Sequence, residues 1–384
     1  MKHISRTARS AAIAVATAAA TALFAVPASA ATADQAHHSA SPSAVFVQSD
    51  NLAGNTVVAY DRAADGALTQ AGVYSTGGLG GALTGSVVDH LASEGSLAYD
   101  QAHQLLYAGN AGSNTVTVFA VHGDQLSRTQ VLSSGGAFPV SIAVHGNLVY
   151  VLNALDGGSI QGYVRVGTSL VAIASWNRTL GLDPTAAPQF THTPGQISFT
   201  PDGSALVVTT KAASNSIDVF PLNGFGAPTA QPVVNAEPNA VPFGFTFDQP
   251  GRLEVTEVGP GTVASFTVNH DGTLTALDSA ATGQAATCWI VRAGDVLYAS
   301  NAGSGTLSGF QDSAGNGALT SIGNTATDPG TVDATTTPDG RFLYVQTGAN
   351  GIVDSFQVNA HGTLTATGSV TVPGAVGGEG IAAG

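Results

Sequence analysis

The sequence predicts an all-β protein, a single seven-bladed β-propeller with four-stranded blades in which the C-terminal strand completes the N-terminal blade. Three observations support this prediction. A strand–turn–strand unit recurs along the chain, equivalent positions are 44 to 55 residues apart, and no stretch has the pattern of a long amphipathic helix. Intervals of this length accommodate four short strands each, which is the size of a propeller blade.

The recurring unit is a short apolar strand, a Gly/Asn turn and a second strand, and it is clearest in segments 105–116, 296–307 and 342–353. A strand that ends in an aromatic residue follows, and then a Gly turn leads into Leu-Thr, as in segments 265–275 and 355–365. Glycine turns between alternating runs are typical of β-hairpins. We therefore expect the second, third and fourth strands of each blade to be joined by these turns.

The innermost strands are expected near seven equivalent positions, namely Gly95, Val140, Gly195, Phe243, Thr287, Val332 and Gly380. The first predicted strand of the folded part, near Val45, has the pattern of a second strand. Segment 379–382 (Glu-Gly-Ile-Ala) resembles segment 94–97 (Glu-Gly-Ser-Leu). We therefore expect the C-terminal segment to pair with the N-terminal blade and to close the ring without an unpaired inner edge.

The first thirty residues have the layout of a secretory signal peptide. Lys2, Arg6 and Arg9 precede an Ala-rich apolar stretch, and small residues end it at Ala30. This pattern predicts cleavage after Ala30 and a secreted protein, with residues 31–42 as a disordered leader and 43–384 as the propeller. No other stretch approaches the ~18 consecutive apolar residues of a membrane-spanning helix, so no membrane span is expected.

Composition excludes some partners. Removing the signal leaves eight Lys+Arg against 25 Asp+Glu, a formal charge of −17, which argues against nucleic-acid binding. Lys211 is the only lysine outside the signal, and Cys288 is the only cysteine, so a buried core rather than a disulfide must hold the fold together. We expect a monomer without a cofactor that binds a small molecule at the channel mouth or an extracellular protein.

The repeat, the Pro-Asp-Gly turns at 201–203 and 338–340 and the strand from Ser214 to Phe220 resemble the lactonase-like seven-bladed propellers, of the 6-phosphogluconolactonase and carboxymuconate-cyclase type. That resemblance implies a histidine after the proline that opens the third blade, a basic pair after the proline of the fourth blade and a glutamate after the fourth blade's second strand. The sequence has Pro139-Val140-Ser141, Pro194-Gly195-Gln196 and Thr209-Thr210-Lys211-Ala212 there. The charged groups that the resemblance implies are therefore missing.

Candidate site residues come from loops that converge on one mouth of the channel. Glu94, Asp333 and Glu379 are expected on one arc, where crowded carboxylates raise one another's pKa and supply a general base or bind a cation. The simpler interpretation is that they cap backbone amides in tight turns. Lys211 is a candidate cation for an anionic group or an oxyanion, or a solvated turn lysine.

Two histidines and two further side chains complete the candidate set. His192 ends an insertion over residues 177–193 that is a candidate lid, and His90 precedes the first innermost strand. Both are candidate acid/base groups or solvated loop residues. Trp289 is a candidate for stacking a ligand or for packing between blades. The predicted catalytic residues are thus Glu94, His192, Lys211 and Asp333, and the predicted substrate-binding residues are His90, Gln196, Trp289 and Glu379.

No metal site is expected from the sequence, since His122, His270 and His361 occupy equivalent outer turns that lie apart around the ring. No nucleophile elbow, zinc-binding His-Glu-x-x-His or phosphate-binding loop occurs in the sequence. Two hypotheses from different classes follow. The first is an enzyme that opens or forms a lactone of a small sugar acid or carboxylic acid, and the second is a non-catalytic exported propeller that serves as a binding platform.

Overall fold

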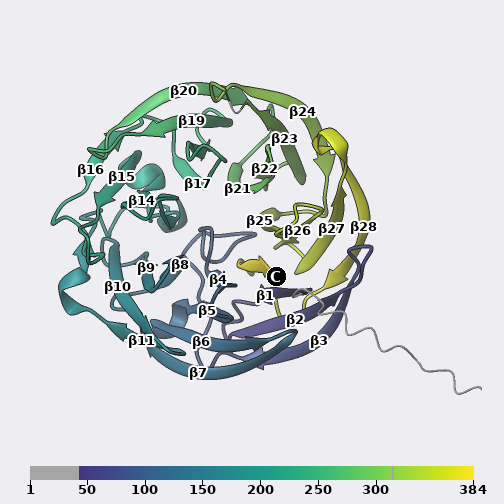
Figure 1. Ribbon diagram of the computed structural model, residues 1–384, viewed down its shortest axis with the longest axis horizontal. Helices are drawn as coiled ribbons and strands as arrows, with labels where there is room; N and C mark the ends of the chain where they lie inside the picture. The colour runs from purple at the N-terminus through teal and green to yellow at the C-terminus, as the bar shows by residue number, and fades with distance from the viewer. Residues whose placement is uncertain (1–42, 314) are drawn as a thin grey trace, which may run out of the picture. The chain divides into compact units, whose positions relative to one another are not determined.

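The computed structural model describes residues 43–313 and 315–384, so the predicted signal and leader, residues 1–42, lie outside the described residues. The described chain folds into seven antiparallel sheets arranged as blades around a central axis (Figure 1). We number the blades in the order in which their second strands occur along the chain. The sequence-based prediction of a seven-bladed, all-β ring is confirmed.

Blades 1 to 4 form the first part of the ring, with their strands given in order from the innermost to the outermost. Blade 1 contains β29 (Ile381–Ala383), β1 (Ala44–Gln48), β2 (Thr56–Arg62) and β3 (Leu68–Ser75). Blade 2 contains β4 (Leu97–Asp100), β5 (Leu105–Asn110), β6 (Thr115–His122) and β7 (Gln125–Ser133). Blade 3 contains β8 (Pro139–His145), β9 (Leu148–Asn153), β10 (Ser159–Val166) and β11 (Ser169–Ala172), with β12 (Arg178–Thr179) also paired to β10. Blade 4 contains β13 (Ile197–Phe199), β14 (Ala205–Thr209), β15 (Ser216–Pro221) and β16 (Val233–Ala236).

Blades 5 to 7 complete the ring with the same strand order. Blade 5 contains β17 (Pro242–Phe247), β18 (Leu253–Glu257), β19 (Thr262–Val268) and β20 (Leu274–Ala281). Blade 6 contains β21 (Thr287–Ala293), β22 (Val296–Asn301), β23 (Thr306–Asp312) and β24 (Leu319–Ala326). Blade 7 contains β25 (Thr331–Thr336), β26 (Phe342–Thr347), β27 (Ile352–Val358) and β28 (Leu364–Thr371). The helices of the described residues are short 3₁₀ turns, namely η1 (Ala111–Ser113), η2 (Ala174–Trp176), η3 (Gln189–Thr191), η4 (Lys211–Ala213) and η5 (Ala360–Gly362).

The burial of each strand follows its place in the blade. The second strands β5, β22 and β26 are buried on both faces because neighbouring blades pack against them, and the first four residues of each are accordingly all apolar. The outermost strands, such as β28, contain exposed and partly buried residues, and no residue of β28 is fully buried. The core is therefore divided among the spaces between blades, in clusters of aliphatic and aromatic side chains.

A repeated tyrosine links neighbouring blades. In three blades the tyrosine of the second strand donates its hydroxyl hydrogen bond to the carbonyl of a hairpin glycine in the next blade: Tyr150 to Gly226 at 2.6 Å, Tyr298 to Gly362 at 2.8 Å and Tyr344 to Gly66 at 2.9 Å. Gly66 has φ +88°, and a Cβ there would lie 2.4 Å from Phe342. Glycine is thus required at this contact by both its backbone conformation and the close approach.

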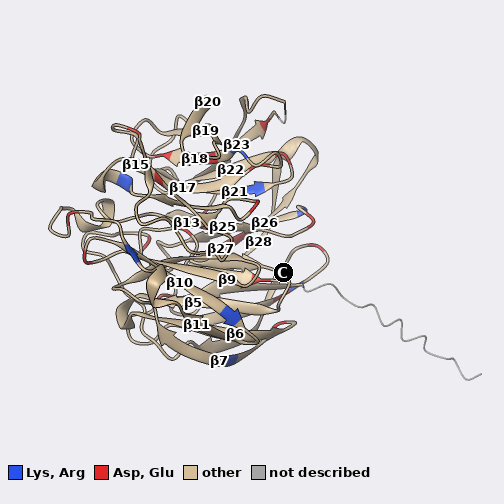
Figure 2. Ribbon diagram, turned by 60° about the vertical axis from the view of Figure 1, so that its left-hand side comes forward, with Lys and Arg blue, Asp and Glu red and all other residues tan. Residues whose placement is uncertain are grey.

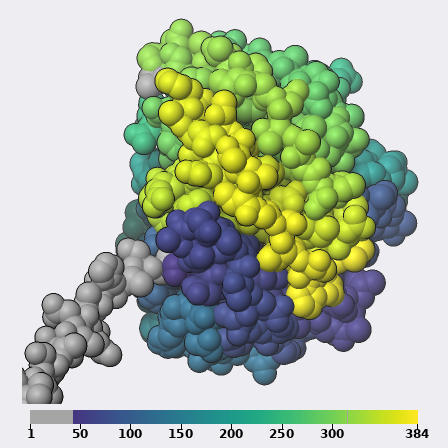
Figure 3. All heavy atoms as spheres, turned by 90° about the vertical axis from the view of Figure 1, so that its right-hand side faces the viewer, coloured from purple at the N-terminus to yellow at the C-terminus, as the bar shows by residue number. Residues whose placement is uncertain are grey.

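The ring closes by pairing of the two ends of the described chain. Strand β29 runs antiparallel to β1, with Val45 opposite Ala383 and Val47 opposite Ile381. Figure 3 shows this side of the molecule, where residues near the start of the described chain lie against residues near its end. The predicted closure of the N-terminal blade by the C-terminal strand is therefore confirmed. No helix among the described residues has the length and apolar character needed to cross a membrane.

Candidate functional site in the central channel

Five carboxyl groups and one amine are buried together around the channel axis. Their residues are at most 7% exposed, and they are Asp50, Asp89, Glu94, Lys211, Asp333 and Glu379. Four of them, Glu94, Lys211, Asp333 and Glu379, belong to the set that the sequence predicted. Asp50 and Asp89 are not among the residues that the sequence predicted. We call these six residues the channel cluster.

The segment that leads into β4, residues 89–95, crosses the middle of the ring (Figure 1). Trp289 of blade 6 donates its indole N–H to the Ser93 carbonyl at 2.6 Å, and the Ile290 amide donates to Glu94 Oε2 at 3.2 Å. The Glu94 amide in turn donates to the Gly195 carbonyl of blade 4 at 3.1 Å. This segment therefore joins blades on opposite sides of the ring and fills one mouth of the channel.

Glu379 precedes the closing strand and holds the segment from the side of blade 1. Its Oε1 accepts hydrogen bonds from the amides of Gly95 at 2.7 Å and Ser96 at 3.2 Å. Its carboxyl group also lies close enough to that of Asp333 for the two charges to interact. Burial raises the pKa of Glu379 well above its usual range, and the nearby Asp333 charge adds to the shift. Burial and the neighbouring Asp333 charge therefore both favour the protonated form of Glu379.

The remaining carboxyl groups also have raised pKa values with burial as the main cause. The pKa of Asp333 is raised to about 7, although the amides of Ala334 and Ile381 donate to it and oppose the shift. The pKa of Asp50 is raised to about 8 and that of Asp89 to about 6. Burial likewise raises the pKa of Glu94 well above its usual range. Several carboxyl groups of the channel cluster therefore titrate near neutral pH.

Lys211 has the opposite shift, since burial lowers its pKa to about 7. Its Nζ donates to the carbonyls of Ala92 at 2.5 Å and Phe190 at 2.7 Å and to the Thr193 hydroxyl at 2.9 Å. The amine also lies 5.2 Å from the ring centroid of Phe243. Lys211 therefore links residues 89–95 and the insertion 177–193 to blade 4 by hydrogen bonds.

The other predicted residues lie at the edge of this arrangement or outside it. His192 Nδ1 lies 2.9 Å from the Pro188 carbonyl within the insertion, so the structure does not bring its ring into the channel cluster. His90 is half-buried beside Gly377, and burial lowers its pKa. Gln196 Oε1 accepts from the Phe245 amide at 2.5 Å. Trp289 packs edge-on against Phe243, with ring centroids 5.0 Å apart.

Replacing Lys211 by methionine is expected to loosen both segments that its amine holds. The change keeps an apolar stem of similar length but leaves three buried acceptors without their donor. We expect faster amide hydrogen exchange in residues 89–95 and 188–193, measured by mass spectrometry, whereas Lys211→Arg should retain most of the protection. Unchanged exchange in both segments would show that the amine does not restrain them.

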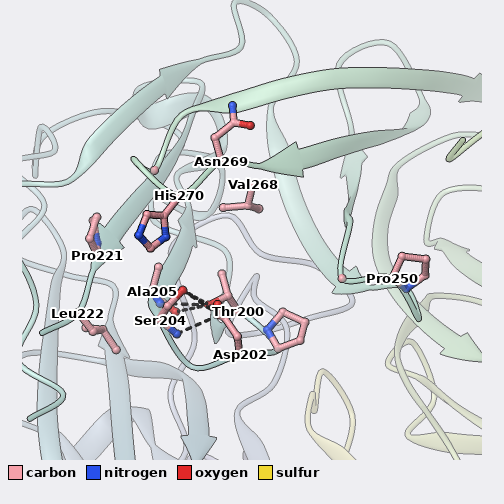
Figure 4. A pocket seen from close by; sticks show the side chains of 13 residues that line it. Thr200, Asp202, Ser204, Ala205, Pro221, Leu222, Pro250, Val268, Asn269 and His270 are labelled. Atoms are coloured by element: carbon pink, nitrogen blue, oxygen red, sulfur yellow. Dashed lines mark hydrogen bonds between the residues drawn. The ribbon is translucent and has the colours of Figure 1, made fainter. Parts of the chain in front are cut away.

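A separate cleft opens on the other face of the ring, between blades 4 and 5. It has a volume of about 530 Å³ and is lined by the turns Thr200–Ala205 and Pro250–Gly251 and by the hairpins around Leu222 and His270. Figure 4 shows His270 and Asn269 on one hairpin above Thr200, Asp202 and Ser204, whose side chains hydrogen-bond one another. Unlike the channel cluster, these polar groups line an open hollow.

Charged residues make up only 9% of the sequence, and Figure 2 shows the Lys and Arg positions scattered among the blades. One ion-paired group is an exception, because Arg252 contacts both Asp248 at 2.5 Å and Asp312 at 3.0 Å. The described chain is therefore an acidic ring with a buried polar cluster at its centre. The fold and this cluster together define a seven-bladed propeller with titratable groups at the channel mouth.

The family of this propeller follows from the sequence comparison. The family described as "Lactonase, 7-bladed beta-propeller" matches residues 51–169 and 254–379, more than half of the chain. The protein belongs to this lactonase propeller family. No curated protein matches the sequence.

Solved structures with the same fold include two proteins described as lactonases. A putative 6-phosphogluconolactonase from Bacteroides uniformis is 19% identical with a TM-score of 0.71, over 87% of this chain and 97% of its own. A periplasmic gluconolactonase from Pseudomonas aeruginosa is 17% identical with a TM-score of 0.68, over 88% of this chain and 98% of its own. At these identities the likeness shows the shared fold.

Proposed function

We propose that this chain is an exported, non-catalytic member of the lactonase propeller family that binds a small polar ligand of the sugar class in the cleft between blades 4 and 5. One observation carries the proposal. The titratable groups of the channel cluster are at most 7% exposed and are engaged with backbone amides and carbonyls of several blades. A substrate cannot reach these groups unless residues 89–95 leave the channel.

The cleft has the properties of a ligand site. Its volume of about 530 Å³ is in the range of small-molecule pockets, and it combines proline and leucine side chains with hydroxyl, amide, carboxylate and imidazole groups. Such a lining suits the hydroxyl groups and apolar ring faces of a neutral sugar. The strongly acidic chain disfavours an anionic ligand, so we expect hexoses to bind more tightly than hexonates.

Calorimetric titration of the purified protein with neutral hexoses and the corresponding hexonates tests this assignment. His270→Ala is expected to weaken binding of a hexose about tenfold, the size of one lost hydrogen bond. His122→Ala is the matched control, because His122 is exposed in the equivalent hairpin of blade 2. Equal losses in both variants, or no heat with any of these sugars, would contradict a site in this cleft.

A second candidate function is lactone hydrolysis or formation in the channel, and the protonation behaviour of the cluster favours it. The pKa of Asp333 is raised to about 7 and that of Lys211 is lowered to about 7, which are values suited to general acid/base work at neutral pH. In this alternative, Asp333 is the base that activates water and Lys211 stabilises the developing oxyanion after residues 89–95 have moved.

One assay separates the two candidates. Proton release is measured with a panel of sugar lactones and carboxylactones for the wild type, Asp333→Asn and Lys211→Met. We expect no turnover above background in any of the three proteins. Turnover in the wild type that falls by about two orders of magnitude or more in both variants would instead establish the channel as an active site.

Export is part of the proposal and rests on the N-terminal sequence pattern of residues 1–30. Expression of the full chain in a secreting bacterial host should give a protein in the medium whose first residue is Ala31. Amino-terminal sequencing checks this expectation, and an intact N-terminus on protein retained in the cells would contradict it.

A further inference from the structure

A second group of carboxylates lies away from the channel, between blades 5 and 6. Asp248 follows β17, Glu254 lies in β18 and Asp312 ends β23, and oxygen atoms of the three lie within 4.8 Å of one another. The residues are buried, with exposed fractions of 4%, 0% and 7%. Three acidic groups from two blades therefore converge at one buried point.

One guanidinium group accompanies them. Arg252 Nε donates to Asp248 Oδ2 at 2.5 Å, and its Nη2 donates to both oxygens of Asp312, at 3.0 and 3.2 Å, and to the Ser313 carbonyl at 2.9 Å. A single positive charge against three carboxylates leaves a formal charge of −2 on the ionised group. Buried charges of one sign require a further compensating charge or protonation.

Glu254 is the member that these contacts leave incomplete. Its Oε1 accepts the Ser265 hydroxyl hydrogen bond at 2.8 Å, but its Oε2 is buried and has no hydrogen-bond partner among residues 43–313 and 315–384. A fully buried carboxylate oxygen without a donor has lost its hydrogen bonds to water and has no protein hydrogen bond to replace them. Because this residue is part of the convergent group, the free oxygen is available to an ion bound between the three carboxylates.

We propose that Asp248, Glu254 and Asp312 form a binding site for a hard divalent cation, with Ca²⁺ as the preferred ion. All the available ligands are oxygens, which suit Ca²⁺, Mg²⁺ and Mn²⁺ rather than softer metals. Ca²⁺ accepts irregular geometry and mixed carboxylate and water ligands, and this tolerance suits a site that shares its acids with Arg252. The bound ion would link blade 5 to blade 6 and neutralise the charge that Arg252 leaves.

The alternative occupant is a proton on Glu254, whose pKa burial raises to about 8, and pH distinguishes it from a metal ion. Protein freed of metal with a chelator is titrated with CaCl₂ at pH 7.5 by calorimetry, and its melting temperature is recorded with and without the ion. We expect one Ca²⁺ per chain and a higher melting temperature in its presence. The gain should shrink at pH 5, where protons compete for the carboxylates.

Two variants locate the ion. Glu254→Gln keeps the shape of the side chain and an acceptor for Ser265, and it should weaken Ca²⁺ binding about tenfold or more because it removes one charged ligand. Asp65→Asn makes the same charge change at an exposed hairpin of blade 1 and should bind as the wild type does. The proposal is wrong if the wild type shows neither heat nor a melting shift with Ca²⁺, or if Glu254→Gln binds as tightly as the wild type. Equal weakening in Asp65→Asn would mean a diffuse charge effect, which also overturns it.

Discussion

Replacing Ile381 by aspartate is expected to prevent stable closure of the ring. Ile381 is 5% exposed and packs with residues of β1, β2 and β26 in the core between blades 1 and 7. A carboxylate at position 381 would have no basic partner in the surrounding apolar cluster. The backbone amide of residue 381 already donates to Asp333, so a second acidic group would also lie close to that carboxylate. We expect a loss of unfolding free energy on the order of 4 kcal/mol or more, measured by urea denaturation.

Val376→Asp is the matched control for this experiment. Val376 is five residues earlier in the same terminal segment but is 60% exposed, so the same substitution should change the unfolding free energy by less than about 0.5 kcal/mol. Gel filtration of the Ile381 variant should also reveal an expanded or self-associating species, because the edge of β1 becomes available for pairing. If both variants unfold like the wild type, closure by β29 contributes little to stability.

The second large effect is a loss of stability as the pH rises from 5 to 8. The folded-state pKa values of Asp89, Asp333 and Asp50 are raised to about 6, 7 and 8, whereas the unfolded chain has ordinary values near 4. The folded state therefore holds more protons than the unfolded state across this range. The stabilisation is fully present below the unfolded pKa and is lost as the pH rises through the folded values.

Lys211 opposes this trend only at higher pH. Its folded-state pKa is lowered to about 7, so the unfolded chain binds more protons on this amine between about pH 7 and the ordinary lysine value. The net decline should thus be steepest between pH 5 and 7. Each raised group contributes roughly 1.4 kcal/mol per pH unit in its own window, and the expected difference between pH 5 and pH 8 is several kcal/mol.

Urea unfolding at a series of pH values measures this slope. Asp333→Asn should flatten it, because the amide no longer takes up a proton, and the exposed Asp65→Asn should leave it unchanged. A wild type that becomes more stable from pH 5 to 8 would show that the channel carboxyl groups are ionised in the folded protein.

The sequence predicted the fold because the repeat is local and frequent. The Leu-Tyr strands and Gly turns recur in neighbouring blades, so each copy supports the others, and the seven predicted positions lie in or within two residues of β4, β8, β13, β17, β21, β25 and β29. The resemblance of segment 379–382 to 94–97 was enough to predict ring closure. Periodicity of this kind is visible without any knowledge of long-range contacts.

The site was harder to predict because it depends on where irregular loops travel. Grouping Glu94, Asp333 and Glu379 followed from blade positions, but nothing in the sequence shows that residues 89–95 cross the ring and bury these side chains. Asp50 was missed because it follows an ordinary strand. The group of Asp248, Glu254 and Asp312 was missed since its members come from different blades and have no recognisable spacing.

The pairing of β1 with β29 also affects how fast this protein folds. The partners Val45 and Ala383 stand at nearly opposite ends of the described chain, so bringing them together has a large loop-closure entropy, while every other strand pair is local. We therefore expect folding in which blades form quickly and the ring then closes slowly. A circular permutant that joins the two ends and opens the exposed turn at Gly294 would make this pair local but would make β21 and β22 the distant pair, so we expect the slow phase to persist with ring closure moved to blade 6.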